Sequence, residues 1–437
     1  MGLELEIKEF VRGQGVDVVG VAGPERLGGP PSLDAGYTMK GARSVVSMAT
    51  PMDVDAIYAF LSKKSPSPHN VDQLHSNQRI HRVARDLAAF IRSQGYRAAV
   101  VPPNNSYRRS LDVFSTHPSF SHRFAAILAG TAGQGWSGNV MTKEYGASVY
   151  LCSVVTDAVL ASDEMLSPRY FVDGYCSRCK LCARTCVAGM FEEEEEDYVL
   201  LNGELYPRGA RRNVDLCNAS CFGLHSLSKD KTWSTWGRHW IDGWVGRRPP
   251  TGRVETRRDL IRGGRATGDA TARFDVIRIA GKTLIDDDLM KELPLPADLP
   301  DDQREMDRIL WDFEKKQGSF GKSKDPNVLT CGQCAMVCGP TLKETASRYK
   351  ALIEGGIVVP GEGGEMVRVD SYAEAVEVRR ANPQRSGALE RVKDSLASFA
   401  LCHRYYFGIE PKSIVGAIRY ERARRRAINS ALTSPEE

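Results

Sequence analysis

The placement of cysteines constrains this 437-residue chain more than any other feature of its sequence. Seven of its eleven cysteines form two dense groups. The first group has the spacing C-x2-C-x2-C-x3-C and the second has C-x2-C-x3-C: Cys176, Cys179, Cys182 and Cys186, then Cys331, Cys334 and Cys338. Three cysteines in a tight loop can bind one face of an iron–sulfur cube, and a helix that follows can carry a fourth thiolate to a neighbouring cube. The pattern therefore predicts two 4Fe–4S clusters that pass single electrons.

The first spacing is that of bacterial ferredoxins, in which the fourth cysteine binds the other cluster. Applied here, it predicts that the first cluster is held by Cys176, Cys179, Cys182 and Cys338. The second cluster would take Cys186, Cys331 and Cys334 and would need one further ligand, either Cys217 or Cys221. We favour Cys217, because residues 211–217 (RRNVDLC) resemble a strand that leads to a ligand.

An all-cysteine zinc site is the alternative to iron and sulfide. Such sites usually consist of two separated C-x2-C pairs, whereas here two such steps run together and a second segment repeats the end of that run. The ferredoxin pattern ends in Cys-Pro, but Val187 follows Cys186 and Gly339 follows Cys338. This departure changes the turn after each ligand and not the number of ligands. Cys152 lies in an apolar run and is predicted to be a core residue.

Composition describes an ordinary globular protein, with 42% apolar and 26% charged residues and a net charge of +4. So small a charge gives no reason to expect a nucleic-acid partner, although mild basicity would suit an acidic electron donor of the ferredoxin or flavodoxin type. The N-terminus shows no export signal, and no run approaches the ~20 apolar residues of a membrane helix. We therefore expect a cytoplasmic protein with no membrane partner, in which cysteines serve metal or redox chemistry rather than disulfides.

The first 170 residues alternate helical and extended patterns, which predicts an α/β or α+β domain. The expected strands are residues 16–23, 44–50, 96–103 and 147–160, and the expected helices are residues 5–14, 54–64, 71–94 and 124–133. The last of these strands is long and apolar enough to be central.

Four regions follow from these patterns: an α+β domain over 1–170, an iron–sulfur domain over 171–222 and 325–345, an insertion over 223–324 and a helical C-terminal region over 346–437. The insertion carries four tryptophans in residues 233–244 (WSTWGRHWIDGW), which could line a substrate pocket or form a local core. Residues 413–432 form a basic amphipathic pattern that we interpret as a solvated helix face.

At this point the chain resembles a known family. Residues 15–27 (GVDVVGVAGPERL) and 41–53 (GARSVVSMATPMD) look like the opening of epoxyqueuosine reductases and of cytoplasmic-type reductive dehalogenases. Residues 121–160 look like the core that these enzymes share, with a glycine-rich turn, a Tyr-Gly step and a strand ending in Thr-Asp. The similarity covers roughly residues 10–190 and the second cysteine group. It does not cover the insertion or the C-terminal region.

The resemblance implies a nitroreductase-like α+β domain that binds cobalamin base-off, with the two clusters feeding electrons to cobalt. The chain lacks the D-x-H-x-x-G motif that usually supplies a lower histidine ligand to cobalt, which is consistent with base-off binding. The resemblance places cofactor contacts in the glycine-rich turn and the Tyr-Gly step: Gly133, Gly135, Trp136, Gly138, Tyr145 and Gly146. Glycine would allow backbone to approach the corrin closely, but the same glycines could simply form a turn between a helix and a strand.

Candidates for the proton donor come from the same comparison. Reductive dehalogenases more often use a tyrosine assisted by a basic residue, and Tyr107 precedes Arg108 and Arg109. An arginine favours phenolate and so eases proton donation, although this tyrosine could equally sit in a surface turn. His122 and His117 are further candidates, and His122 could instead be a packed or capping residue.

Three functions remain distinct. The leading one is reductive dehalogenation of a small organic molecule. The second is reduction of an epoxide in a modified nucleoside of tRNA, which is weakened because Ser119 stands where epoxyqueuosine reductases carry an aspartate. The third is electron transfer by clusters alone, or activation of another corrinoid protein.

Overall fold

The computed structural model describes residues 2–101, 103, 118–221, 225–237, 252, 255–256, 331–362, 366–382 and 411–433. It has a mixed α+β fold, as predicted, built around a four-stranded sheet with the order β1-β2-β6-β3. The strands are β1 (Val18–Ala22), β2 (Ser44–Pro51), β3 (Ala98–Val101) and β6 (Val149–Thr156). Every pair is antiparallel. The apolar run of β6 lies inside the sheet, which confirms its predicted central position.

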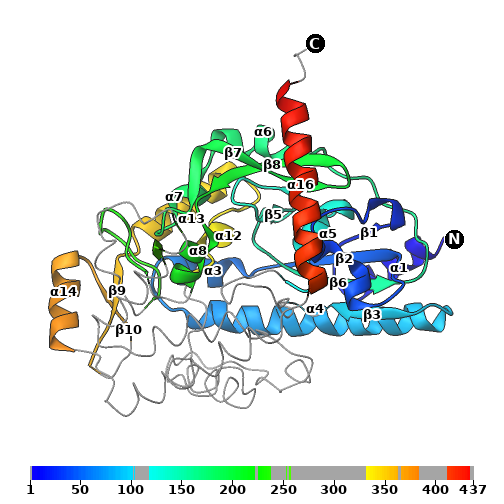
Figure 1. The fold of residues 1–437 in the computed structure, drawn as a ribbon. Helices are drawn as coiled ribbons and strands as arrows, with labels where there is room; N and C mark the ends of the chain where they lie inside the picture. The colour runs from blue at the N-terminus through cyan, green and yellow to red at the C-terminus, as the bar shows by residue number, and fades with distance from the viewer. Residues whose placement is uncertain are drawn as a thin grey trace.

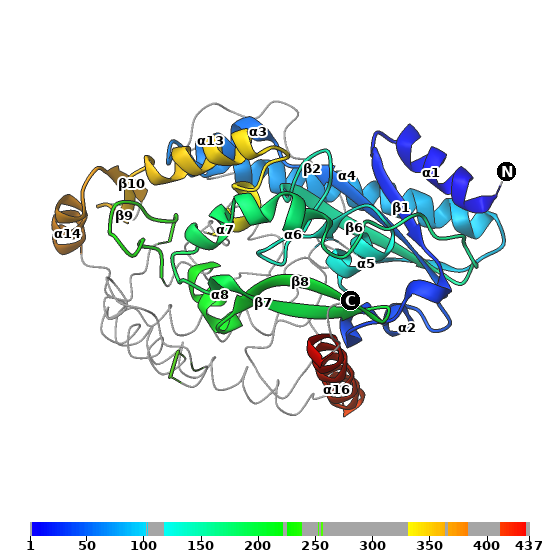
Figure 2. The ribbon, with the colours of Figure 1, turned by 90° about the horizontal axis from the view of Figure 1, so that it is seen from above.

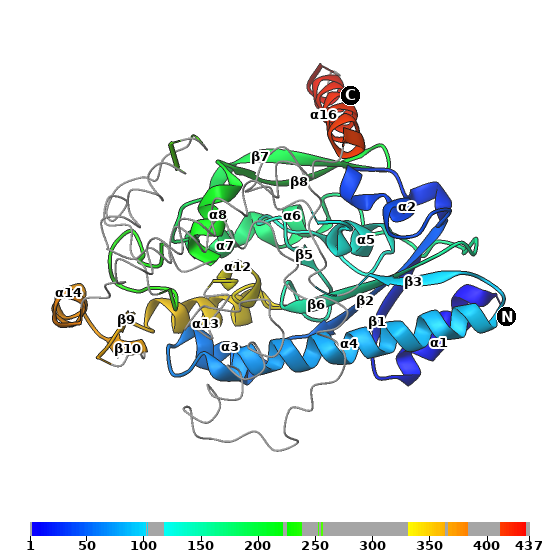
Figure 3. The ribbon, with the colours of Figure 1, turned by 60° about the horizontal axis from the view of Figure 1, so that its bottom comes forward.

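Helices cover both faces of this sheet (Figure 3). On one face α1 (Leu3–Gly13) and the long α4 (Ser67–Ser93) bury Ile7, Ile80 and Leu87 against alternate residues of the strands. On the other face α5 (His122–Leu128) buries its apolar residues against Val45 and Val155. The period of two along each strand separates these two cores. Cys152 lies in the first core with no exposed surface, and burial raises the pKa of its thiol to about 12, so its predicted core role is confirmed.

Short elements connect the sheet to the cysteine groups. They are α2 (Ala35–Thr38), α3 (Val54–Leu61), the strands β4 (Gly133–Gln134) and β5 (Val140–Met141), and α6 (Tyr170–Gly174). The cysteines themselves lie in or beside η3 (Cys176–Arg178), α7 (Leu181–Arg184), α8 (Val214–Cys221) and α12 (Gln333–Met336). In Figure 1 the helices α7, α8 and α12 gather in the middle of the molecule, although α12 is distant in sequence from the other two.

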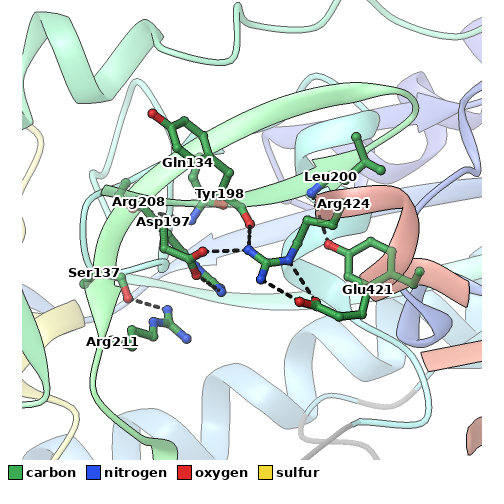
Figure 4. Close-up of polar contacts among 11 residues, drawn as sticks. Gln134, Ser137, Asp197, Tyr198, Leu200, Arg208, Arg211, Glu421 and Arg424 are labelled. Carbon is green, nitrogen blue, oxygen red and sulfur yellow. Dashed lines mark hydrogen bonds and ion pairs between the residues drawn. The ribbon is translucent and has the colours of Figure 1, made fainter. Parts of the chain in front are cut away.

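A long hairpin, β7 (Phe191–Leu201) and β8 (Glu204–Arg211), extends from the cysteine groups to the C-terminal helix α16 (Pro411–Thr433), as Figure 2 shows. Arg424 of α16 donates hydrogen bonds to Asp197 Oδ1 (2.6 Å) and to the carbonyl of Tyr198 (3.0 Å). The hydroxyl of Tyr420 accepts a hydrogen bond from the backbone N–H of Leu200 (3.1 Å). Figure 4 shows these contacts, which dock α16 onto β7.

The second cysteine group is followed by α13 (Leu342–Ile353), the hairpin β9 (Ile357–Pro360) and β10 (Met366–Val369), and α14 (Tyr372–Ala381). Thr341 and Ser371 cap the two helices by accepting from Glu344 N and Glu374 N. Trp233 and Trp236 are buried against α3 and α13, and the indole of Trp236 donates to the carbonyl of Phe60 (2.9 Å). For these two tryptophans the local-core interpretation is therefore confirmed.

Within the part of the chain that the structure describes, no helix combines the length and hydropathy needed to span a bilayer.

Candidate iron–sulfur site

The two cysteine groups share one apolar setting. Cys176 is buried in a cluster with Trp136, Met141, Phe171 and Phe191, and five further cysteines pack against this cluster: Cys182, Cys186, Cys217, Cys334 and Cys338. Thiolates in such an apolar setting are poorly solvated. Shielding from water is one of the means by which a protein controls the reduction potential of an iron–sulfur cluster.

The second cysteine group repeats the backbone of the first. In the step from Cys179 to Cys182 and in the step from Cys331 to Cys334, the residue after the leading cysteine has a positive φ, 49° at Lys180 and 96° at Gly332. A short helix begins next and carries the second cysteine, Cys182 in α7 and Cys334 in α12. A left-handed residue followed by a helix reverses the chain within a few residues. The two loops can therefore present their thiols in the same way.

The first predicted ligand set is brought together from both groups. Burial raises the pKa of the Cys182 thiol, and the charges of Cys338 and Cys176 raise it further. Burial likewise raises the pKa of Cys338, and Cys176 and Cys179 add to the effect. Cys338 thus lies among Cys176, Cys179 and Cys182, although about 150 residues separate it from them in sequence.

The second predicted set is also close together. Burial raises the pKa of Cys186, to which the charges of Cys331, Cys217 and Cys334 contribute. The Sγ atoms of Cys217 and Cys221 lie 3.9 Å apart. This contact lowers the pKa of Cys217 to about 7, and a similar contact of Cys221 lowers the pKa of Cys331. Both candidates for the fourth ligand therefore reach this set.

The prediction of a strand before Cys217 is wrong. Strand β8 ends at Arg211, and residues 214–221 form helix α8. The side-chain oxygen of Asn213 accepts hydrogen bonds from the backbone N–H groups of Asp215 (3.0 Å) and Leu216 (3.3 Å). This cap satisfies N–H groups that the first turn of a helix leaves free, and so it starts the helix.

The donor set fits iron–sulfur clusters. It consists of thiols alone, and the ligands of a cubane each bind a different iron atom, so they stand around a cluster instead of meeting at one point. Among the described residues, no three Cys, His, Asp or Glu side chains converge as one metal ion would require.

Two N–H groups donate to the thiols of the second set. Asn139 Nδ2 lies 3.2 Å from Cys334 Sγ, and the backbone N–H of Met190 lies 3.3 Å from Cys186 Sγ. Hydrogen bonds to ligand sulfur stabilise negative charge on a cluster and are one of the ways in which a protein sets its potential. No sequence motif marks Asn139 beyond its place in the glycine-rich turn.

Arg348 of α13 fixes the second cysteine group to the sheet. Its guanidinium is almost fully buried and donates to Ser148 Oγ (2.6 Å) and to the carbonyl of Met336 (2.9 Å). The backbone N–H of Ala147, just before β6, donates to the carbonyl of Cys338 (3.0 Å). No sequence motif points to Arg348, although it lies in the buried stripe of α13 between Thr345 and Leu352, where an arginine is unusual.

Protein atoms surround the predicted cobalamin contacts. A Cβ added to Gly133 would meet the ring of Phe171 at 2.8 Å, and one added to Gly146 (φ 62°) would meet the carbonyl of Gly339 at 2.3 Å. A Cβ on Gly135 or Gly138 would likewise strike protein atoms, and Trp136 is buried with its indole donating to the carbonyl of Glu192 (3.0 Å). Close packing within the protein is thus a sufficient reason for these glycines. Their role in binding cobalamin, with that of Tyr145, stays a prediction that rests on the resemblance alone.

The predicted catalytic residues are divided. Tyr107 and Arg108, together with Arg109 and His117, lie outside the described residues. His122 begins α5 and is buried, with its Nδ1 2.9 Å from Ser153 Oγ of β6. Its ring also lies edge-on to Phe120. These contacts match the packed interpretation, and its catalytic role stays a prediction.

Comparison with known proteins agrees with the resemblance seen in the sequence motifs. No family model matches the chain. Over 201 residues it is 30% identical to the tetrachloroethene reductive dehalogenases of Dehalobacter restrictus and Desulfitobacterium hafniense. This match covers 45% of the chain and 31% of each relative, so the chain spans about a third of the length of the curated relatives. The predicted resemblance to reductive dehalogenases, which are oxidoreductases, is thereby confirmed over the matched residues.

Solved structures give weaker likenesses. A catabolic reductive dehalogenase in complex with 3-bromo-4-hydroxybenzoic acid is 18% identical, with a TM-score of 0.36 over 49% of this chain and 28% of that one. Epoxyqueuosine reductase from Streptococcus thermophilus is 13% identical, with a TM-score of 0.30 over 72% of this chain and all of that one.

Proposed function

We propose that this chain is an iron–sulfur- and cobalamin-dependent reductase that removes halide from a small organic molecule. The observation that carries the proposal is the gathering of two cysteine groups, about 150 residues apart in sequence, into two neighbouring sets of buried thiols. The similarity to reductive dehalogenases supports the choice of reaction. Its fold would be a nitroreductase-like domain joined to a ferredoxin-type domain.

The described residues would hold the clusters, shield them and set their charge. Cys176, Cys179, Cys182 and Cys338 would bind the first cluster, and Cys186, Cys331, Cys334 and Cys217 the second. The apolar cluster around Trp136 excludes water, which strengthens electrostatic interactions with the iron. Two neighbouring iron–sulfur clusters enclosed by the same apolar side chains would give single electrons a short route.

The overall reaction consumes two electrons and one proton and releases halide, with hydrogen replacing the halogen on carbon. A low-potential donor of the ferredoxin or flavodoxin type would supply the electrons. Cobalamin enters from the resemblance and would supply the metal at which the carbon–halogen bond breaks. The proton would come from Tyr107, assisted by Arg108, or from His122.

Anaerobic reconstitution with iron, sulfide and cobalamin tests the proposal. We expect about eight irons per chain, as two 4Fe–4S clusters require, bound cobalt, and halide release from a halogenated phenol or alkane with a low-potential donor. Cys182→Ser should lose iron and activity, whereas Cys152→Ala, a buried cysteine outside both groups, should keep its iron. Zinc in place of iron and sulfide would contradict the cluster assignment.

The same preparation separates the two other functions. A tRNA stem loop carrying epoxyqueuosine should remain unchanged, and its reduction without any halide release would favour the tRNA-modifying function. Full iron content with no bound cobalt would favour electron transfer by clusters alone.

A further inference from the structure

Three consecutive residues of the glycine-rich turn connect two arginines to the second set of cysteines. The carbonyl of Ser137 accepts a hydrogen bond from Arg211 Nη2 (2.6 Å), and the carbonyl of Gly138 accepts one from Arg123 Nη1 (3.5 Å). The next residue, Asn139, donates to Cys334 Sγ (3.2 Å). One turn therefore places two guanidinium groups beside a ligand of the second set.

These two guanidinium groups have no carboxylate partner within the described ranges. The third arginine of this region, Arg208, pairs with Asp197, which Arg424 also binds, as Figure 4 shows. Arg211 is the more shielded of the unpaired two, since its Nε is cut off from solvent and meets no hydrogen-bond partner in the described part of the chain. A shielded cation is costly unless negative charge lies near it.

The negative charge near Arg211 comes from the cysteines. Burial and the neighbouring Arg208 and Arg123 lower the pKa of Arg211, whereas the thiolates of Cys217 and Cys334 raise it. Both cysteines belong to the second set. In turn Arg211 and Arg123 lower the pKa of Cys217.

Two cations near the first set are neutralised by carboxylates. Lys180 lies close to Cys176 but pairs with Glu194 (3.5 Å), and Arg184 lies close to Cys179 but pairs with Glu193 (3.2 Å). Both glutamates belong to the acidic run of β7. Arg178, between Cys176 and Cys179, is exposed and donates to the carbonyl of Gly174. The two sets therefore differ in their surroundings, because the shielded guanidinium without a carboxylate partner, that of Arg211, lies beside the second.

We propose that Arg211, helped by Arg123, makes the second cluster the more easily reduced of the two. The inference rests on the proposed function, because it requires that both iron–sulfur clusters are bound. An added electron makes a cluster more negative, so a fixed positive charge nearby favours the reduced form and raises the reduction potential. Arg123 is exposed and screened by solvent and salt, which leaves Arg211 as the larger influence. An electron on the pair would therefore reside mainly on the second cluster.

Potentiometric titration of the reconstituted full chain, followed by electron paramagnetic resonance, tests this. Arg211→Gln should lower the midpoint potential of one cluster and leave the other in place. Arg211→Lys keeps the charge and should restore most of the potential. Arg184→Gln is the matched change beside the first set. It should shift the midpoint potential of either cluster by less than Arg211→Gln shifts that of the second.

Unchanged midpoints in a fully loaded Arg211→Gln variant would overturn the inference while leaving the proposed function intact. If that variant fails to hold its second cluster, Arg123→Gln replaces it in the test. A smaller decrease in the midpoint potential of the same cluster is then expected. An unchanged midpoint potential would overturn the inference. Wild-type protein without iron and sulfide would instead overturn the proposed function itself.

Discussion

Cys217 and Cys221 lie one turn apart on α8 with their Sγ atoms 3.9 Å apart, and both lie beside Cys331. Only one of them can complete a cluster that already has three ligands. The charge of Cys217 also influences Cys186 and Cys334, which with Cys331 form the rest of the set. Cys217 therefore faces all three predicted partners.

We expect Cys217→Ser to lose about four of about eight irons, because a 4Fe–4S cluster needs four thiolates. Cys221→Ser should keep both clusters. Iron and sulfide analysis after anaerobic reconstitution measures this directly. The reverse result, with iron lost only in the Cys221 variant, would make Cys221 the ligand.

Arg348 provides a second prediction. Replacement by alanine would leave the carbonyl of Met336 and the hydroxyl of Ser148 without their buried donor. We expect a loss of about 3 kcal/mol in the free energy of unfolding, as for other buried charged groups that lose a partner. Anaerobic urea unfolding measures it.

Lys350 offers the control on the same helix. Its side chain is 70% exposed and pairs weakly with Glu354 (3.8 Å), so Lys350→Ala should change stability by less than about 0.5 kcal/mol. Equal effects of the two substitutions would show that Arg348 does not hold the second cysteine group in place.

The gathering of the cysteines and the central sheet could be predicted from sequence because their signals are local. Ligand spacing is fixed by the size of a cluster, and the apolar run of β6 marks a strand buried on both faces. The strand expected before Cys217 is instead the helix α8, because the start of this helix depends on one side chain, Asn213, that caps it.

Strand β7 shows what sequence could not reveal. Five successive glutamates, residues 192–196, favour neither burial nor a strand. They lie within a strand because β8 pairs with both ends of this stretch, at Phe191 and at Glu196, with an irregularity between them. Basic side chains from other segments also neutralise them, as Arg169 does for Glu196 and Arg212 for Glu192. Such partners come together only in the folded chain. The same holds for Arg211 and Asn139, which become neighbours of the second cysteine set through the turn at Ser137.

His69 predicts how stability depends on pH. Its ring is buried against Phe60, with centroids 5.0 Å apart, and burial lowers its pKa from 6.5 to about 4. The unfolded chain therefore binds a proton in this range that the folded chain does not. The contribution of neutral His69 to the free energy of unfolding is fully present above pH 6.5. It is lost as the pH falls toward 4, by up to about 3 kcal/mol.

Anaerobic urea unfolding at pH 7, 6 and 5 should show the wild type losing stability on acidification. His69→Gln removes the titrating group, so its stability should fall less steeply over the same interval. Parallel curves for the two proteins would show that this histidine is protonated equally in the folded and unfolded states.

Docking of α16 onto β7 supplies the last prediction. Arg424 bridges Glu421 of its own helix to Asp197 of the strand, and its side chain is only 20% exposed (Figure 4). Arg424→Ala should cost about 1 kcal/mol, since the pair is partly shielded. It should also speed hydrogen exchange at Leu200, whose N–H group donates to the Tyr420 hydroxyl. Arg425 binds the same Glu421 but is 75% exposed and makes no ion pair with β7 in the described chain, so Arg425→Ala should leave exchange at Leu200 unchanged. Faster exchange in both variants would mean that helix stability, and not the contact with Asp197, keeps α16 in place.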